Sequence, residues 1–368
     1  MYTHIPKLGF GMMRLPMNGA EVDIEQTKKM VDRFIDAGFT YFDTARGYID
    51  GLSERAVKTA LTDRYPRDAY LLADKYSWWC VKDGDNEGFF KSQLERTGVE
   101  YFDFYLIHAL DKSSYEKYNA QNAWEFCATL KKQGLVKSYG FSFHDDAEFL
   151  DKVLTEHPEV DFVQLQINYL DWESDSVQSA LCYQVARRHN KPVTVMEPVK
   201  GGALAVLPEE GRRMLAAVDA NRSPASFAIR FVASLDGIVT VLSGMSDEMQ
   251  AEDNIATMSD FSPLSVAETE AVAAVAELLN AIPTVPCTAC KYCVENCPAG
   301  IAIPNILRGA YNSYLSYNNL PMSKNRYKQA LSNGAAASAC VGCGACMEVC
   351  PQKIQITELM KKAAELFE

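Results

Sequence analysis

The stretch Phe102-Asp103-Phe104-Tyr105-Leu106-Ile107 is short and rich in aromatic and apolar residues, as expected of a buried β-strand. Seven comparable runs occur in the first 245 residues, and amphipathic stretches separate them. Two of these stretches, 23–37 and 119–133, carry their apolar residues on one face, which predicts helices packed on a sheet. The other predicted strands are 8–12, 39–42, 69–73, 137–141, 162–165, 193–196 and 238–242.

The order of these segments predicts an α/β fold. Strand and helix alternate at about thirty residues per unit, and eight such units fit a closed parallel (β/α)8 barrel, whose usual size is about 250 residues. A doubly wound open sheet is the alternative, and it ordinarily has a glycine-rich Gly-x-Gly-x-x-Gly turn after its first strand. The segment Leu8-Gly9-Phe10-Gly11-Met12 has only half of that pattern, so the barrel is favoured.

A second domain is predicted after the barrel. A helix rich in alanine and glutamate covers about 263–279, and Pro283 and Pro286 follow it. Eight of the eleven cysteines lie beyond these prolines. We therefore place a barrel domain at 1–282 and a small, mainly helical cysteine-rich domain at 283–368.

Composition limits the classes of partner. The chain has 368 residues, 48% of them apolar, which is enough for a large core. Its 36 Lys and Arg against 48 Asp and Glu give a net charge of -12, which disfavours nucleic acid and anionic lipid surfaces. No apolar run approaches the roughly 20 residues of a membrane helix, and no leader follows Met1. We expect a soluble, cytoplasmic protein without a membrane partner.

The clustered cysteines follow one spacing twice. Each group reads Cys-x-x-Cys-x-x-Cys-x-x-x-Cys-Pro, a pattern in which three cysteines hold one [4Fe-4S] cubane and the fourth turns toward the other cubane. The spacing therefore predicts two clusters with exchanged ligands. The first cluster would take Cys287, Cys290, Cys293 and Cys350, and the second Cys340, Cys343, Cys346 and Cys297.

A pair of four-cysteine zinc sites is the alternative, because zinc also accepts paired Cys-x-x-Cys ligands. The spacing instead resembles that of a bacterial two-cluster ferredoxin. Here 42 residues separate Cys297 from Cys340, and helical patterns at 303–317 and 324–332 occupy that insert. The domain is thus similar to the helical ferredoxins of respiratory iron-sulfur subunits.

Four polar residues lie just beyond predicted strand ends or in the loop that follows. Asp43 follows the second strand, Tyr48 lies five residues later, Lys75 follows the third strand and His108 the fourth. In a parallel barrel these ends share one face, and adjacent strands lie about 5 Å apart. We therefore expect Asp43 and Lys75 to pair, with His108 one strand further round and Tyr48 over all three.

This group suits proton delivery to a carbonyl oxygen while hydride reaches its carbon. A neighbouring ammonium favours phenolate, so Lys75 is expected to lower the pKa of Tyr48. Asp43 would hold Lys75 charged and oriented. His108 would hydrogen-bond the substrate oxygen as negative charge develops.

The same residues carry a family resemblance. Asp43-Thr44-Ala45, Tyr48, Ser53-Glu54, Lys75 and Leu106-Ile107-His108 resemble the catalytic tetrad region of the aldo-keto reductases. The similarity covers roughly 8–258, with further matches at Gly140-Phe141-Ser142, Val163-Gln164, Asn168, Ser223-Pro224-Ala225, Arg230, Ser243-Gly244 and Asp253-Asn254.

The resemblance implies a nicotinamide cofactor bound at the barrel mouth without a Rossmann turn. Ser142 and Gln164 would bind its carboxamide, and Met196 stands where many members have a stacking aromatic. The segment 243–254 would meet the phosphates and adenosine, but it has no Lys or Arg and four acidic residues, which leaves NADPH and NADH both open. The cofactor residues implied there are Ser243, Gly244, Met245, Ser246, Gln250, Asp253 and Asn254.

Two functional hypotheses follow. In the first, the barrel reduces a small-molecule aldehyde or ketone by itself, and the clusters brace the fold or serve a redox protein partner. In the second, the chain is an iron-sulfur electron carrier whose barrel is a docking or sensing scaffold. The complete tetrad favours the first hypothesis, a fused aldo-keto reductase with a two-cluster ferredoxin-like domain.

Overall fold

The computed structural model describes residues 2–175, 177–282, 284–317 and 320–368. The backbone divides into two compact units, and each is described separately below. We predicted a domain boundary between residues 282 and 283; residue 283 lies outside the described residues, and this boundary remains a prediction. The first unit comprises Met1–Val199 and Leu204–Val272, and the second comprises Lys200–Ala203 and Ala273–Glu368.

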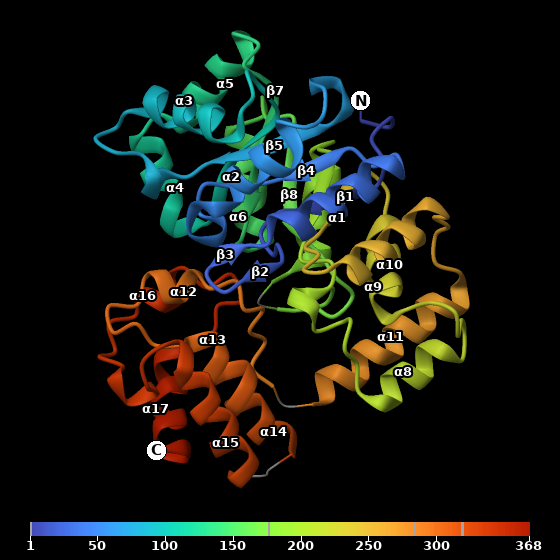
Figure 1. Ribbon diagram of the computed structural model, residues 1–368, viewed down its shortest axis with the longest axis vertical. Helices are drawn as coiled ribbons and strands as arrows, with labels where there is room; N and C mark the ends of the chain where they lie inside the picture. The colour runs from blue at the N-terminus through green and yellow to red at the C-terminus, as the bar shows by residue number, and fades with distance from the viewer. Residues whose placement is uncertain (1, 176, 283, 318–319) are drawn as a thin grey trace. The chain divides into compact units, whose positions relative to one another are not determined.

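Eight parallel strands close into a barrel in the described part of the first unit, in the order β1-β10-β9-β8-β7-β6-β5-β4 (Figure 1). The predicted (β/α)8 fold is confirmed, and an open sheet is excluded because β1 pairs with both β10 and β4. The strands are β1 (Leu8–Gly11), β4 (Tyr41–Asp43), β5 (Leu71–Tyr76), β6 (Phe102–Leu110), β7 (Val136–Phe143), β8 (Phe162–Gln166), β9 (Val193–Met196) and β10 (Ile238–Ser243). A short antiparallel hairpin of β2 (Met17–Asn18) and β3 (Glu21–Val22) follows β1.

Helices surround the barrel on its outer side (Figure 1). The first of them, α1, begins after Asp23, whose side chain accepts a hydrogen bond from the backbone N–H of Gln26. Its apolar face, including Met30 and Phe34, is buried against the strands. The helices of the first unit are α1 (Ile24–Asp36), α2 (Leu52–Val57), α3 (Asn86–Thr97), α4 (Lys112–Ala120), α5 (Ala123–Lys132), α6 (Ala147–Glu156), α7 (Ser179–Arg188), α8 (Glu209–Ala216), α9 (Pro224–Ala233) and α10 (Glu248–Ser259). The helix α11 (Val266–Ala281) begins in the first unit, and its residues from Ala273 on belong to the second.

Three of the predicted catalytic residues lie inside strands rather than beyond them, and Asp43 is the last residue of β4. The third barrel strand, predicted at 69–73, begins at Leu71 and continues to Tyr76, and Lys75 pairs in register with Leu106. His108 also lies within β6, at the point where the pairing with β7 shifts register between Ile107 and Leu110. A polar residue at the mouth of a barrel can keep its place in the hydrogen-bond ladder, because the side chain alone turns toward the mouth.

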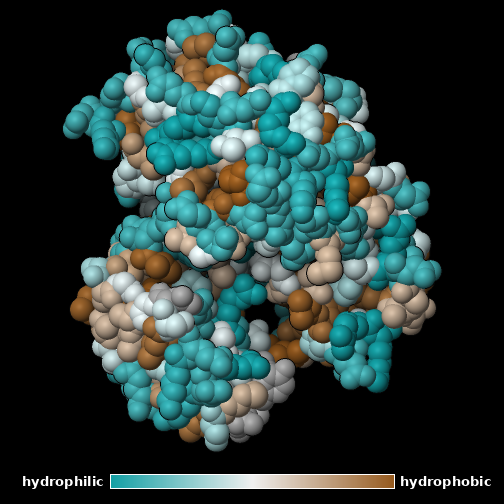
Figure 2. Space-filling model, in the orientation of Figure 1, coloured by the Kyte–Doolittle hydropathy of each residue, from teal (hydrophilic) through white to brown (hydrophobic). Residues whose placement is uncertain are grey.

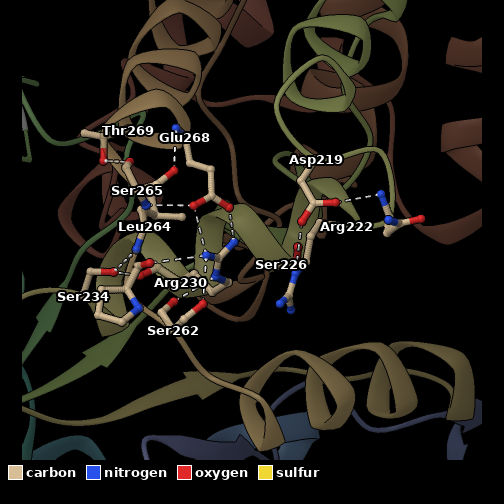
Figure 3. Close-up of polar contacts among 12 residues, drawn as sticks. Asp219, Arg222, Ser226, Arg230, Ser234, Ser262, Leu264, Ser265, Glu268 and Thr269 are labelled. Carbon is tan, nitrogen blue, oxygen red and sulfur yellow. Dashed lines mark hydrogen bonds and ion pairs between the residues drawn. The ribbon is translucent and has the colours of Figure 1, made fainter.

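A buried ion pair fixes the start of α11 on the end of α9. Arg230 donates to both carboxylate oxygens of Glu268, at 2.5 and 3.1 Å, and to the backbone carbonyl of Ser262 at 3.0 Å (Figure 3). The backbone N–H of Ser265 donates to the same carboxylate at 2.8 Å. Arg230, one of the family-like residues in the sequence, therefore has a structural role here.

The second unit is mainly helical, as predicted. Its core contains Ile306, Leu307 and Met360, and the cysteines Cys293 and Cys346 are part of it. The helices are α12 (Tyr292–Glu295), α13 (Ile303–Asn305), α14 (Asn312–Tyr317), α15 (Leu320–Ala330), α16 (Ala345–Glu348) and α17 (Ile356–Phe367).

The surface in view is largely hydrophilic, with apolar patches that include one over α12 and α16 (Figure 2). Within the described residues, no helix combines the length and the apolar character needed to cross a membrane.

Candidate active site and cysteine pockets

The carboxyl ends of β4, β5 and β6 bring the four predicted catalytic residues together. Lys75 Nζ donates to Asp43 Oδ1 at 2.6 Å and to the backbone carbonyl of Thr44 at 2.8 Å. The ammonium also lies 4.6 Å from the centre of the Tyr48 ring. The Tyr48 and His108 rings meet edge to face, with centroids 5.7 Å apart. All four side chains are buried.

The backbone of Lys75 is held from both sides by residues that sequence reasoning missed. Its N–H donates to Asp74 Oδ1 at 2.8 Å, and its carbonyl accepts from Gln93 Nε2 at 3.0 Å. Gln93 is fixed in turn by the Tyr105 hydroxyl, which donates to Gln93 Oε1 at 2.6 Å. The signal available in the sequence was a glutamine among the apolar residues Phe89, Phe90 and Leu94.

Behind this support lies a buried carboxylate, Glu54 on α2. Arg46 Nε donates to Glu54 at 2.7 Å, and Arg96 pairs with the same oxygen. Burial, with a further contribution from the charge of Glu54, raises the pKa of Asp74 well above its usual range.

The electrostatics of Tyr48 differ from the sequence-based expectation. Burial raises the pKa of its phenol well above the ordinary value, and the carboxylates of Asp43, Asp74 and Glu197 raise it further. We expected Lys75 to lower this pKa, and that was wrong for the structure described here, because desolvation and three carboxylates dominate. A phenol of this kind keeps its proton at neutral pH, as a proton donor must until the moment of transfer.

His108 is neutral and oriented. Burial lowers the pKa of its imidazole well below the usual range, and the charges of Lys75 and His144 add to that effect. Its Nδ1 lies 3.0 Å from Ser77 Oγ. If the Ser77 hydroxyl donates to Nδ1, the proton of the neutral ring is on Nε2. Trp79 packs beside the imidazole, with ring centroids 5.3 Å apart.

The predicted carboxamide residues lie on the neighbouring strands. Ser142 and Gln164 are in register on β7 and β8. Gln164 Nε2 lies 3.7 Å from the sulfur of Met196 at the end of β9, and Thr194 Oγ1 donates to Gln164 Oε1 at 3.4 Å. Ser142 Oγ accepts from the backbone N–H of Ala109 at 2.7 Å. The structure therefore groups Gln164 with Met196 and ties Ser142 to the end of β6.

The segment after β10 forms a compact turn into α10. Asn254 Nδ2 donates to Ser243 Oγ at 2.7 Å, and Gln250 Oε1 accepts from the backbone N–H of Ser246 at 2.9 Å. The side chain of Met245 is fully buried in the barrel core. Of these expected cofactor residues, Met245 thus directs its side chain away from solvent.

The acidic residues of this segment have partners. Arg33 of α1 pairs with Glu248 at 3.0 Å and also with Glu252. Ser223 Oγ donates to Asp253 at 2.6 Å. Their charges are therefore partly compensated within the first unit, which the sequence pattern alone did not reveal.

Arg14, in the loop after β1, is a further cation that sequence reasoning missed. Its side chain packs on Gly244, where an added Cβ would lie 3.1 Å from Arg14 Cδ. Its guanidinium lies 3.5 Å from Glu197 Oε1, one residue beyond Met196. A basic residue three positions beyond the end of the first strand was the signal available for it.

The second unit gathers its eight clustered cysteines around two pockets. One pocket is lined by Cys287, Cys290, Cys293 and Cys350, together with apolar and a few polar residues. The other is lined by Cys297, Cys340, Cys343 and Cys346 and by mainly apolar residues. Each pocket therefore combines three cysteines of one sequence group with the fourth of the other.

The thiols within each set influence one another. Burial raises the pKa of the Cys293 thiol, with further contributions from neighbouring cysteines including Cys290 and Cys350. Burial, with Cys340 and Cys297 nearby, raises the pKa of Cys346 to about 11. Such pockets favour a positively charged inorganic group that would hold the sulfurs as thiolates.

One family model matches each part of the chain. The model of the aldo/keto reductase family matches residues 7–277, and that of a 4Fe-4S dicluster domain matches residues 286–354. A methylglyoxal reductase of Yersinia pestis is 25% identical over 232 residues, which are 62% of this chain and 74% of that protein. A 9,11-endoperoxide prostaglandin H2 reductase of Trypanosoma cruzi is 27% identical over 242 residues, 65% of this chain and 77% of that protein.

Solved structures share the barrel. The holo form of an aldo-keto reductase from Bacillus halodurans is 23% identical with a TM-score of 0.60, and the match covers 74% of this chain and 92% of that one. A Klebsiella pneumoniae aldo-keto reductase in complex with NADPH is 20% identical with a TM-score of 0.58, over 77% and 94%. At these identities the structures support the fold alone. With its family match over 7–277 and its tetrad geometry, the chain belongs to the aldo-keto reductase family, in a form fused to a C-terminal 4Fe-4S dicluster domain.

Proposed function

We propose that this chain reduces the carbonyl group of a small aldehyde or ketone to an alcohol with a nicotinamide cofactor. The observation that carries the proposal is the buried convergence of Tyr48, Lys75 and His108 at one barrel mouth. In this group Tyr48 is the proton donor, Lys75 is the fixed cation and His108 is a neutral hydrogen-bond donor.

The reduction needs one hydride at carbon and one proton at oxygen. A bound dihydronicotinamide would supply the hydride to the carbonyl carbon. Tyr48 would give its phenolic proton to the oxygen, and Lys75 would stabilise the phenolate that forms, because its ammonium lies 4.6 Å from the ring centre. The Nε2–H of His108 would donate to the same oxygen as negative charge develops there.

The chain's own residues fit such a cofactor. Ser142 and Gln164 would orient the carboxamide beside the tetrad, with Met196 against the ring. The turn from Ser243 to Asn254 would face the phosphates, and Arg14, packed on Gly244, adds the cation that this turn lacks. Either NADPH or NADH suits this arrangement, and the NADPH complex of the Klebsiella relative favours testing NADPH first.

Two [4Fe-4S] clusters are proposed for the second unit. Each pocket presents four cysteine sulfurs, the donor set that such clusters take. Cys287, Cys290, Cys293 and Cys350 would hold the first cluster, and Cys297, Cys340, Cys343 and Cys346 the second. Clusters pass one electron at a time, whereas hydride carries two, so we assign them to bracing the fold or to a redox protein partner. Reduced cysteines of this kind suit the cytoplasm.

Replacement of Tyr48 by Phe tests the barrel chemistry. Carbonyl reduction should be lost while the visible absorbance of the clusters is unchanged. Tyr41→Phe is the matched control, because the Tyr41 hydroxyl is buried in the barrel with no hydrogen-bond partner among the described residues, and its removal should leave turnover intact. Turnover that survives in Tyr48→Phe would show that the acid is misassigned.

Oxygen-free purification tests the clusters. We expect about eight irons and eight sulfides per chain. A colourless product that binds zinc would replace the clusters by zinc sites. A cluster-loaded chain that turns over no member of a panel of aldehydes and ketones, with NADH or NADPH, would instead support the electron-carrier hypothesis.

A further inference from the structure

Gln352 lies at the first cysteine pocket, two residues beyond Cys350. Its side chain is 5% exposed, and its Oε1 accepts a hydrogen bond from Lys200 Nζ at 3.1 Å. Its Nε2 is buried with no hydrogen-bond partner among the described residues. A buried amide N–H of this kind is costly unless an acceptor completes it.

The chemistry of lysine fixes which way this amide points. An ammonium has donors only, so the carbonyl oxygen of Gln352 must face Lys200, and the NH2 group must face elsewhere. The pocket that Gln352 lines with Cys287, Cys290 and Cys350 offers sulfur as an acceptor.

Lys200 lies next to the loops that line this pocket. The segment Lys200–Ala203 belongs to the second unit. Gly201 has a positive φ of 60°, and a Cβ there would lie 2.4 Å from the carbonyl oxygen of Thr288, the residue after Cys287. Arg308 Nη1 donates to the Gly201 carbonyl at 3.4 Å. Lys200, which is 6% exposed, is therefore held beside two ligand loops of the same set.

The second pocket is different. Its lining within the described residues, apart from the cysteines, is apolar except for Thr357, and it contains no amide or charged side chain. The two pockets thus present unequal polar surroundings to the groups that they would hold.

We propose that Gln352 donates an N–H···S hydrogen bond to the first cluster and that Lys200 orients this amide, so that together they raise the reduction potential of the first cluster relative to the second. This rests on the two clusters proposed above. Reduction adds negative charge to a cluster, and a hydrogen-bond donor and a buried cation both stabilise the charged form. Gln352 would thus contact the cluster directly, and Lys200, which acts through Gln352, is a positioning residue.

The test is a potentiometric titration of the full cluster-loaded chain, followed by electron paramagnetic resonance, for Gln352→Leu and Lys200→Met. Gln355→Leu is the matched control, because it makes the same change at an exposed position three residues later. In both test variants the first cluster should become harder to reduce, with about a tenfold fall in its reduced-to-oxidised ratio at a fixed potential, or ~59 mV. The second cluster and the control should not move.

The signals are assigned with Cys290→Ser and Cys343→Ser, each of which alters one ligand set. Unchanged potentials in both test variants, with iron and sulfide content intact, would overturn the proposal. Equal shifts of both clusters would overturn it as well. If Gln352→Leu loses iron, Lys200→Met decides, because it keeps the amide side chain and removes the cation that orients it. A parent chain without two clusters would refute the proposed function instead, and iron analysis separates that case.

Discussion

Asp43→Asn is expected to destabilise the barrel more than most single substitutions do. Asp43 and Lys75 are 2% and 0% exposed, and the carboxylate is the charged partner of the ammonium at 2.6 Å. Removing one member of a buried pair costs about 3–5 kcal/mol, because the other charge stays buried and uncompensated. The asparagine oxygen and the Thr44 carbonyl still accept hydrogen bonds from Lys75, so we expect about 3 kcal/mol. Domains have only about 5–15 kcal/mol in total.

The double variant Asp43→Asn with Lys75→Met makes the prediction sharper. It removes the uncompensated charge, so the double variant should be more stable than Asp43→Asn alone by about 1 kcal/mol or more. Urea unfolding followed by tryptophan fluorescence is the suitable assay, because every tryptophan of the chain lies in the first unit. These residues are Trp78, Trp79, Trp124 and Trp172.

Two results would contradict this reasoning. A loss below about 1 kcal/mol in Asp43→Asn would mean that the ammonium is well solvated or readily neutralised. A double variant no more stable than the single one would mean that the cost comes from packing rather than from the unpaired charge. Lys75→Met alone serves as the control for lost packing at that position.

Three further predictions concern other parts of the chain. The hydrogen bond and ion pair with Arg230 lower the pKa of Glu268 to about 2, so the folded state binds fewer protons than the unfolded chain. The stability that the Arg230–Glu268 pair contributes should be complete above about pH 4.5 and should fall by about 2 kcal/mol as the pH drops toward 2. In urea titrations, Glu268→Gln should be less stable than the parent chain at neutral pH and should lack this part of the acid dependence. Ser77→Ala removes the hydroxyl beside His108 Nδ1. The lost hydrogen bond should reduce transition-state stabilisation by about 1–2 kcal/mol and so lower kcat/KM roughly tenfold. An unchanged rate and pH profile would refute the tautomer assignment. Chelation of iron should abolish helical circular dichroism of the second unit without changing tryptophan fluorescence, since cysteines form part of that unit's core; retention of all helicity would show that the unit folds without metal.

The barrel could be foreseen because its signal is local. Each of the eight predicted strands overlaps an observed one, since short aromatic and β-branched runs between amphipathic stretches need no long-range information. The strand ends were predicted less well: Asp43, Lys75 and His108 were placed beyond their strands, yet all three lie within them. Strand ends depend on pairing with neighbours, which one sequence does not contain.

The sequence by itself determined the classes of chemistry. The four tetrad residues occur in order along the chain, and the spacing of the eight cysteines can be read directly from two segments. Only the tertiary structure decided the surroundings that tune them. Asp74 and Gln93 hydrogen-bond the backbone of Lys75. The side-chain oxygen of Gln352 accepts a hydrogen bond from Lys200, which lies 152 positions away in the sequence. Burial and charge act through space, so the high pKa of Tyr48 and the unequal cysteine pockets appear only once distant residues are packed together.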